Sequence, residues 1–467
     1  GLPRPESCPS SLIASANPML MPAPRLAARP TFPREGLTGR KEAVGRLVAV
    51  RNVEAKAAQQ GRPNLALRQD SEREAERIYA RDALARLFQA VQSEHGFYER
   101  LVSFWMDHFA INAQASYETR LMIGLFEAEA VRPRLGGRFS DLLQAAAMHP
   151  AMLIAFDQTR STSPQSPSGA AAELRDQLAR HLLFQQTMGG AGVSDDDVRG
   201  ASLLLAGIGV DPATLALAHV AAQADPAAQA VLGKTYGADG RKPDDHLRLL
   251  EDLAERPETI DHVCRKLATH FLGAEAAGDV MDGMKAAWMA SGGTLVAVYQ
   301  AMLEHPAAFS PQPQVLLRPF DFVVSALRAF GLSARQLDEI AAQASGVPIE
   351  NSAEPEAKTG ARLAPGVATQ LTLEGLRRMG QPIWQPPVLD GAPQDESSWL
   401  TGPLFGERIA WARLATRGLP IAPDPDRLLQ AALADAVPDD LARLVREAPS
   451  RSQALTMVLV SPAFNRR

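Results

Sequence analysis

The sequence predicts an all-α protein, a large multi-helix body that carries an extended proline-rich arm and several irregular loops. Alanine and leucine dominate the 467 residues, long runs of Val, Ile and Thr are missing, and there are only five Trp and five Tyr. Because alanine and leucine are strong helix formers whereas β-branched and aromatic residues favour strands, this composition indicates helices throughout. The length exceeds what one simple core accommodates, so we expect two or three domains or one large helical body.

Composition also narrows the classes of function. A formal net charge of −5 argues against a general nucleic-acid binder, which would carry a basic face. No apolar stretch approaches the roughly 20 residues of a membrane-spanning helix, so we expect no membrane span. The two cysteines, Cys8 and Cys264, are too few for a disulfide framework or a zinc cluster and are expected to be free thiols. No motif indicates a metal or an organic cofactor, and we expect none.

Residues 1–40 are predicted to be an arm and residues 41–467 the helical body. Eight prolines interrupt the first 40 residues, which predicts an extended segment that lies on the body. From Lys41 to about Gln92 the apolar residues recur at three- and four-residue steps, which predicts a helix with one buried stripe. That stripe consists of Ala80, Leu84, Leu87, Phe88 and Val91.

Three segments of the body are predicted to be irregular. Residues 158–172 are rich in Pro, Ser and Gly, and a loop of this length inside a compact domain is often functional. Residues 341–366 form a second soft connection, and residues 380–399 contain several prolines. Trp384 and Trp399 suggest that this last strip is extended and packed by its aromatic side chains.

The acidic run that follows Ser194 is predicted to begin a helix. Ser194 is suited to the N-cap position and Asp197 to the third helical position, as in a capping box. Calcium binding is the alternative for this run. Arg199 stands where the fifth loop ligand would be and no twelfth-position glutamate follows, so the helix start is favoured.

A short motif recurs along the chain. Pro150, Pro306 and Pro462 each end a similar helical stretch, and successive copies are 156 residues apart. An internal duplication would explain the spacing and would give sub-units at 41–225 and 226–467. The alternative is that proline ends alanine-rich helices wherever they stop.

The histidines that precede the first two of these prolines are expected to have a structural role. His149 and His305 would stand at helix C-termini, where an imidazole meets the terminal carbonyl groups favourably.

The polar side chains around residues 157–186 are the candidates for a catalytic site. His181 borders a stripe of leucines on a predicted helix, so it is either a half-buried, hydrogen-bonded core residue or part of an active site. An enzyme of the hydrolase or metal-dependent type would draw on His181, Asp176, Asp157 and His108 in a cleft here. His108 is otherwise expected to be a hydrogen-bonded residue of a packed aromatic helix. The nine histidines show no metal-binding spacing.

An ordered set of segments resembles one bacterial protein family, the one known as domain of unknown function 1800. The segments are FWMDHFAIN, HPAMLIAFDQTRS, LARHLLFQQTMGGAGVSDDDVRGASLLLAGIGV, VLGKTYG, CRKLATHFL, ASGGTLVAVYQAMLEHPAAF, RPFDFVVSALRAFG, MGQPIWQPPVLDG and SPAFNRR. The resemblance spans roughly residues 97–467. It implies a predominantly helical protein, and a partner protein, since genes of the family often neighbour those of a second family whose members bear export signals.

The same resemblance implies that the helix around His181 has changed. Members of the family usually carry Asn-Glu-Asn where this chain has Arg175, Asp176 and Gln177. They usually carry glutamate in place of His181 and of Phe184, and histidine in place of Gln186. Adjacent carboxylates and imidazoles suit metal binding or acid–base chemistry. This chain therefore reads as a divergent member with a degenerate polar site.

The leading hypothesis is thus a non-enzymatic binding or scaffold protein that interacts with another bacterial protein. The export signals of the neighbouring gene family suggest that this partner is exported. The alternative is the enzyme described above. A third hypothesis, a glycan-binding protein that stacks sugars on Trp384 and Trp399, competes with simple core packing of those rings. The compartment stays open between periplasm or envelope and cytoplasm, because a cleaved presequence and a remnant of cloning both fit a chain that starts at Gly1.

Overall fold

The computed structural model describes residues 36–59, 65–169, 173–211, 214–309, 315–345, 363–388, 391–433 and 437–466. Helices make up most of this part of the chain, and its only sheets are two small two-stranded ones, which confirms the predicted all-α class. Most of the predicted arm, with Cys8, lies outside the described residues. Residues 36–40 were expected in the arm but form the first turn of a helix, because no proline follows Pro33 until Pro63.

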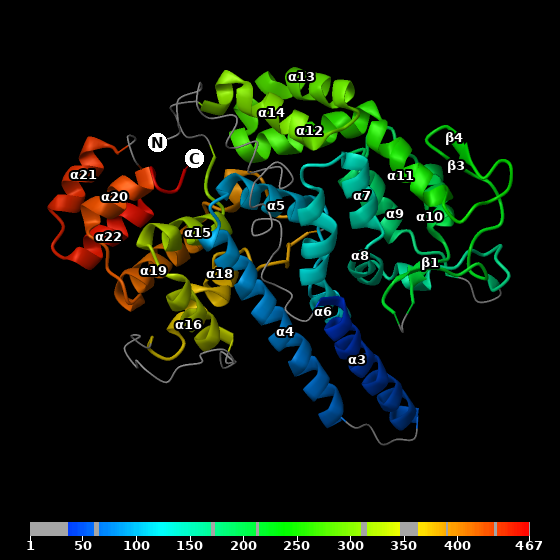
Figure 1. Ribbon diagram of the computed structural model, residues 1–467, viewed down its shortest axis with the longest axis horizontal. Helices are drawn as coiled ribbons and strands as arrows, with labels where there is room; N and C mark the ends of the chain where they lie inside the picture. The colour runs from blue at the N-terminus through cyan, green and yellow to red at the C-terminus, as the bar shows by residue number, and fades with distance from the viewer. Residues whose placement is uncertain are drawn as a thin grey trace.

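The first two helices form a long antiparallel hairpin that projects from the body (Figure 1). They are α3 (Gly36–Gln59) and α4 (Leu65–Gln92), and α6 (Tyr117–Leu125) packs against both. The predicted stripe on α4 is confirmed, since Leu84, Leu87, Phe88 and Val91 are buried and Ala80 is half-buried.

The middle of the chain builds the central part of the body. Its elements are α5 (Gly96–His108), a π-helical turn η2 (Phe126–Val131), a 3-10 turn η3 (Arg132–Arg134), α7 (Phe139–Ala147), α8 (Pro150–Ala155), a 3-10 turn η4 (Gln158–Arg160), α9 (Gln177–His181), a π-helical turn η6 (Leu182–Gln186), and α10 (Asp195–Leu205). A layer of four helices lies beside them (Figure 1), namely α11 (Asp245–Glu255), α12 (Pro257–Leu272), α13 (Ala274–Ser291) and α14 (Leu295–Glu304).

The last third of the chain packs on the other side of α4 and α5 (Figure 1). It consists of α15 (Pro319–Phe330), α16 (Ala334–Ser345), α17 (Val367–Leu371), α18 (Leu373–Arg378), a 3-10 turn η8 (Glu396–Ser398), α19 (Gly402–Gly418), α20 (Pro425–Leu433), α21 (Asp439–Arg446) and α22 (Arg451–Val460), and a 3-10 turn η7 (Pro306–Phe309) precedes it. Buried apolar side chains form one continuous cluster from α3 to the C-terminal segment. The helices therefore share a core across both of the expected sub-units.

Two small β-hairpins were not anticipated from the sequence. Strands β1 (Ile208–Val210) and β2 (Leu217–His219) pair antiparallel, as do β3 (Gln229–Val231) and β4 (Lys234–Tyr236). The β3–β4 turn has positive φ at both Leu232 and Gly233, which is the geometry of a two-residue hairpin turn. Their alanine-rich sequence carries no strand pattern, so tertiary contacts decide this structure.

The predicted capping box at the start of α10 is confirmed. The Ser194 side chain accepts a hydrogen bond from the Asp197 amide, and the Asp197 carboxylate accepts one from the Ser194 amide. The second Asp197 oxygen accepts from the Leu232 amide at 2.5 Å. The acidic run is therefore a helix start that also fastens the β3–β4 turn.

The soft connections follow the prediction in part. Residues 161–169 are irregular, whereas α16 continues to Ser345 and so enters the segment 341–366 that was predicted to be irregular. Residues 346–362 lie outside the described part. In the strip 380–399 both tryptophans are buried, with Trp384 donating to Glu127 and Trp399 to the Pro393 carbonyl. Core packing, and not an exposed stacking face, is thus the role of these two rings.

The segments that lead into α7 and α14 pair with each other through two reciprocal hydrogen bonds, as in a local two-fold symmetry. The Phe139 amide donates to the Gly293 carbonyl and the Leu295 amide donates to the Gly137 carbonyl, both at 2.9 Å. A shift of 156 residues relates Phe139 to Leu295 and Gly137 to Gly293, so it turns one of these hydrogen bonds into the other. Gly-Gly, Gln-Ala and His-Pro-Ala recur at matching positions of the two segments, 136–151 and 292–307. The duplication itself stays a prediction, and this pairing is what supports it.

The expected role of His149 and His305 was wrong in its detail. Each ring does not bind the carbonyl groups of the preceding helix but caps the turn that follows. Nδ1 of His149 accepts from the Ala151 amide at 3.1 Å, and Nδ1 of His305 accepts from the Ala307 amide at 3.3 Å. The proline between each pair lacks an N–H, so the amide one residue later is the donor that needs a partner.

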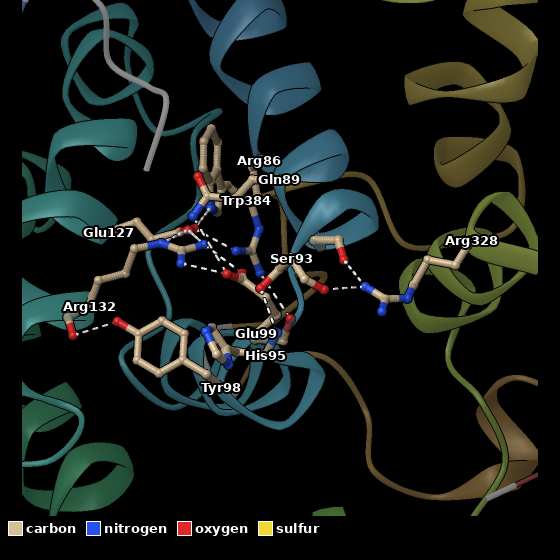
Figure 2. A network of polar contacts seen from close by, with 12 residues as sticks. Arg86, Gln89, Ser93, His95, Tyr98, Glu99, Glu127, Arg132, Arg328 and Trp384 are labelled. Atoms are coloured by element: carbon tan, nitrogen blue, oxygen red, sulfur yellow. Dashed lines mark hydrogen bonds and ion pairs between the residues drawn. The ribbon is translucent and has the colours of Figure 1, made fainter. Parts of the chain in front are cut away.

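A buried network of charges joins the hairpin, α5, the η2–η3 turns and the strip 380–399 (Figure 2). Arg132 lies between two carboxylates, with Nη2 2.7 Å from Glu99 Oε2 and Nε 2.9 Å from Glu127 Oε1. Arg86 reaches the other Glu127 oxygen at 2.8 Å, and Trp384 Nε1 donates to that same oxygen at 3.1 Å. Two guanidinium groups therefore balance two carboxylates inside the core.

Burial alone would lower the pKa of Arg132, but Glu99 and Glu127 raise it on balance, so its charge is retained. Such a network is sensitive to the loss of one member, because the partner's charge then stays buried without compensation.

Replacing Arg132 by methionine should destabilise the protein by roughly 3–5 kcal/mol, since Glu99 would lose its guanidinium partner. Urea denaturation followed by circular dichroism measures this loss. The matched control is Arg377→Met, which removes an exposed pair with Glu374 and should leave the free energy of unfolding nearly unchanged. Equal effects of the two substitutions would contradict a structural role for the network.

Candidate functional site

The helix that carries His181 runs from α9 directly into the π-helical turn η6. Leu178 and Leu182 are buried, as the leucine stripe predicts, and His181 is only 3% exposed. Its ring stacks on Phe156 with ring centroids 4.5 Å apart. Neither ring nitrogen has a hydrogen-bond partner among the described residues, so His181 is more buried and less satisfied than the sequence indicated.

Two further histidines approach the end of the same turn. Nε2 of His108, at the end of α5, lies 3.0 Å from the Gln186 carbonyl oxygen. Nε2 of His262, on α12, lies 3.0 Å from the Gln185 carbonyl oxygen. The centroids of these two imidazoles are 6.3 Å apart. Because the π-helical turn ends here, its last carbonyl groups lack helical partners and the imidazoles satisfy them.

We refer to His108, His181 and His262 as the histidine cluster. Burial lowers the pKa of His181 to about 3, and the positive charge of Lys266 on α12 adds to this effect. Burial likewise lowers the pKa of His108 well below its usual range, with Lys266 and His262 contributing. His108 and His181 are thus neutral at physiological pH, because burial disfavours the charged form and no carboxylate among the described residues offsets it.

The glycines after η6 allow this close packing. At Gly189, whose φ is +61°, a Cβ would lie 2.5 Å from His262 Nδ1. At Gly190, whose φ is +77°, a Cβ would lie 2.7 Å from the Phe184 ring. The turn 189–192 therefore closes over a histidine and a phenylalanine, which is a packing role and not a phosphate cradle.

The two predicted carboxylates lie elsewhere. Asp176 begins α9 and pairs with Arg180 at 2.7 Å, and its side chain is 46% exposed. Asp157 adopts a left-handed backbone and pairs with Arg175 at 3.3 Å, with 40% of its side chain exposed. No described contact joins either carboxylate to a histidine of the cluster. The four candidates thus divide into two buried imidazoles and two surface ion pairs.

This division limits the chemistry available to the predicted cleft at residues 157–186. General acid–base catalysis requires a titrating group within hydrogen-bond reach of its partner. Neutral imidazoles without a carboxylate can exchange hydrogen bonds but do not form such a set. Within the described ranges, no group of three or more His, Cys, Asp or Glu side chains is arranged to hold a metal ion.

His262 and Lys266 belong to this neighbourhood, yet the sequence did not bring them forward. In the sequence His262 stands eight residues before His270 on a predicted helix, a spacing too long for the two to share a metal ion. Its partner in the structure, the Gln185 carbonyl, is 77 residues away in the chain. Only the position of α12 across the end of η6 reveals the cluster. Cys264, one turn from these residues, is a free and buried thiol, as expected.

The histidine cluster should make stability depend on pH. An imidazole with a folded-state pKa below its ordinary value of 6.5 destabilises the folded state as the pH falls, because the unfolded chain binds the proton first. For His181 this loss begins near pH 6.5 and grows until about pH 3.

Replacing His181 by phenylalanine, which keeps a ring on Phe156, should remove this contribution. Relative to wild type, the variant should be about 2 kcal/mol more stable at pH 5 than at pH 7.5, that is, its free energy of unfolding should be larger by that amount. Urea titrations at several pH values test this, with the exposed His219→Gln as control. A stability–pH profile identical to that of wild type would contradict a lowered pKa of His181 in the folded state.

No helix in the described part of the chain is both long and apolar enough to traverse a lipid bilayer. No curated protein and no solved structure matches the chain. A protein family described as DUF1800, a protein of unknown function, matches residues 19–466 and thereby confirms the resemblance inferred from the sequence. The chain therefore belongs to the DUF1800 family.

Proposed function

We propose that this protein is a non-catalytic binding or scaffold component that acts by engaging a partner protein. The observation that carries the proposal is the separation of the candidate site into neutral, buried histidines and surface carboxylates. His181 has no charged partner inside the molecule, and Asp157 and Asp176 are held by arginines at its surface. An acid–base pair is the minimum that the enzyme alternative needs.

The resemblance to the family pattern supports this reading. Where members usually carry glutamate, this chain has His181 and Phe184, and where they usually carry histidine it has Gln186. Phe184 packs over Gly190, and the Gln186 side chain is buried with Nε2 3.7 Å from the Met152 sulfur. Where the family pattern has charged or metal-binding side chains, this chain thus has side chains that pack inside the helix bundle.

The α3–α4 hairpin is the surface that we assign to the partner. It stands out from the body (Figure 1); α6 packs against both of its helices, and α15, α16 and α18 contact α4. Val48 and Val53 on α3 are 37% and 52% exposed, so the hairpin presents apolar side chains among its ion pairs. A projecting helix pair is a geometry that proteins use to dock on another helix or groove.

Replacing Val48 and Val53 together by lysine should weaken capture of the partner at least tenfold, since it places two charges in an apolar contact. The measurement is affinity capture of the tagged full-length chain from its native source, after mild crosslinking and with quantitative mass spectrometry. The same protein should be lost in the variant and retained in wild type.

Two control variants make this test specific. Leu217→Lys alters an equally exposed apolar residue on the remote β2 strand and should leave capture unchanged. His181→Phe should also leave capture unchanged, because the histidine cluster is internal. Recovery of the wild-type chain alone and monomeric under all solubilising conditions would contradict the proposal.

A further inference from the structure

A surface groove lies where α7 begins, where α11 passes into α12, and where α13 ends. Its volume is about 530 Å³, and its lining comes from residues 138–141, 251–260 and 288–293. This volume is within the range of sites that hold small molecules or a few peptide side chains. We call it the α13 groove, and α13 lies on the opposite side of the body from the free end of the α3–α4 hairpin (Figure 1).

Trp288, near the end of α13, contributes to the inner wall of this groove. The residue is only 3% exposed, and its ring packs on Phe139 with the ring centroids 5.1 Å apart. The other four tryptophans of the chain each donate a hydrogen bond from Nε1 to a side chain or to a main-chain carbonyl group. Trp288 is the exception, since its Nε1 donates to none of the described residues. A buried indole therefore keeps an unused donor.

The N–H edge of the Trp288 ring is open to the groove. Gly293 lines the groove beside it, and a Cβ at this glycine would lie 3.2 Å from Trp288 Nε1. Because Gly293 has φ +80°, a conformation that favours glycine, no side chain covers this edge of the ring. Nε1 also keeps accessible surface, unlike the polar atoms that are enclosed without a partner, such as Nδ1 of His181. The groove thus offers a hydrogen-bond donor to a group that enters from outside.

Carboxylates dominate the rim of the groove. Asp141, Glu251 and Glu255 all line it and are exposed. Asp141 and Glu255 have no partner within the described ranges, and Glu251 only accepts a hydrogen bond from a glutamine amide at 3.3 Å. Arg138 is the one cation among the lining residues, and its Nε donates to the Gly292 carbonyl at 2.9 Å and not to a carboxylate. Three negative charges against one positive charge favour a cationic occupant.

An apolar side chain projects beside the same groove. Met289 is 67% exposed, more than any other large apolar side chain in the described part of the chain. Ile260 and Ala254 continue the apolar surface into the wall of the groove. Methionine is adaptable in packing and is common at surfaces that bind peptides. The groove therefore combines an apolar contact, a neutral donor and a set of carboxylates.

We propose that the α13 groove binds a basic segment of a partner protein. An arginine or lysine side chain of that segment lies among Asp141, Glu251 and Glu255, and a main-chain carbonyl group accepts from Trp288 Nε1. An apolar side chain next to the basic residue covers Met289. A small polyamine would match the carboxylates but has no acceptor for the indole, so a peptide segment fits both features. This proposal does not depend on the partner assigned to the hairpin.

The test uses the full-length chain and the peptide acetyl-Leu-Arg-Leu-amide, with a citrulline peptide as its neutral analogue. At about 0.15 M salt, where exposed charges alone are screened, ligand-observed NMR should show saturable binding of the arginine peptide at roughly millimolar or lower concentrations. The citrulline peptide should bind at least about fivefold more weakly, because it keeps the carbonyl groups but loses the charge. Spermidine, which has the charge but no carbonyl group, should also bind more weakly than the arginine peptide.

Two variants separate the two halves of the site. Trp288→Phe keeps a ring on Phe139 but removes the donor, so it should weaken binding of the arginine peptide roughly three- to tenfold. Asp141→Asn combined with Glu255→Gln should weaken it to a similar degree. Both of these carboxylates are exposed and unpaired, so this double variant should fold as wild type does even if the tryptophan variant is destabilised.

The control is a double variant that removes the same charge elsewhere. Asp338→Asn on α16 combined with Glu447→Gln after α21 changes two exposed acidic residues and should leave peptide binding unchanged. Absence of saturable binding to wild type, equal binding of the arginine and citrulline peptides, or unchanged binding by the Asp141 and Glu255 variant would overturn the proposal. Tighter binding of spermidine than of the peptide would also overturn it, since a small polyamine would then be the occupant.

Discussion

Arg132, enclosed between Glu99 and Glu127, is the contact on which the arrangement of this molecule depends. It joins α5 to the η2–η3 turns, and through Glu127 it reaches Arg86 on α4 and Trp384 in the strip 380–399 (Figure 2). Buried ion pairs contribute little net stability compared with apolar packing, because the desolvation of each charge offsets the attraction. Their effect is on specificity, since any other packing of these four segments would leave a charge inside without its partner. The network therefore favours one relative position of these alanine-rich helices over the alternatives.

The histidine cluster follows from that fixed register. Glu99 anchors the first turn of α5, and His108 stands at the last residue of the same helix. Once α5 is placed, His108 meets the Gln186 carbonyl at the end of η6, and α12 brings His262 to the Gln185 carbonyl. Two imidazoles thus serve as caps for a π-helical turn that ends inside the protein. A neutral ring with an N–H suits this task, and burial keeps His108 neutral by lowering its pKa.

Much of the fold could be predicted from the sequence because local rules decide it. The stripe on α4 and the capping box of Ser194 and Asp197 depend on spacing and side-chain type within a few residues, and the burial of Trp384 and Trp399 follows from their large apolar rings. The network of Arg132 could not be predicted, although Glu127 and Arg132 stand out as charges within an apolar stretch, because their partners come from three other segments. The β-hairpins were missed for a related reason, since alanine-rich strands carry no period of their own and Asp197 and the neighbouring helices impose them. The sequence predicted which stretch of the chain holds the candidate site but not which residues belong to it. Asp157 and Asp176 pair with nearby arginines at the surface, while His262 comes from α12.

Arg132 and Arg318 show two ways in which a guanidinium is held inside this chain. Arg132 uses Nε, Nη1 and Nη2 on two carboxylates, so all three of its nitrogens are engaged. Arg318 is nearly as buried, yet Nη1 alone has a carboxylate partner and Nε has none among the described residues. A buried nitrogen without a partner keeps a desolvation cost, which the packing around it must offset. Arg318 ties the residue before α15 to Asp107 on α5, so this cost accompanies the same kind of link between distant segments that Arg132 provides at the other end of that helix.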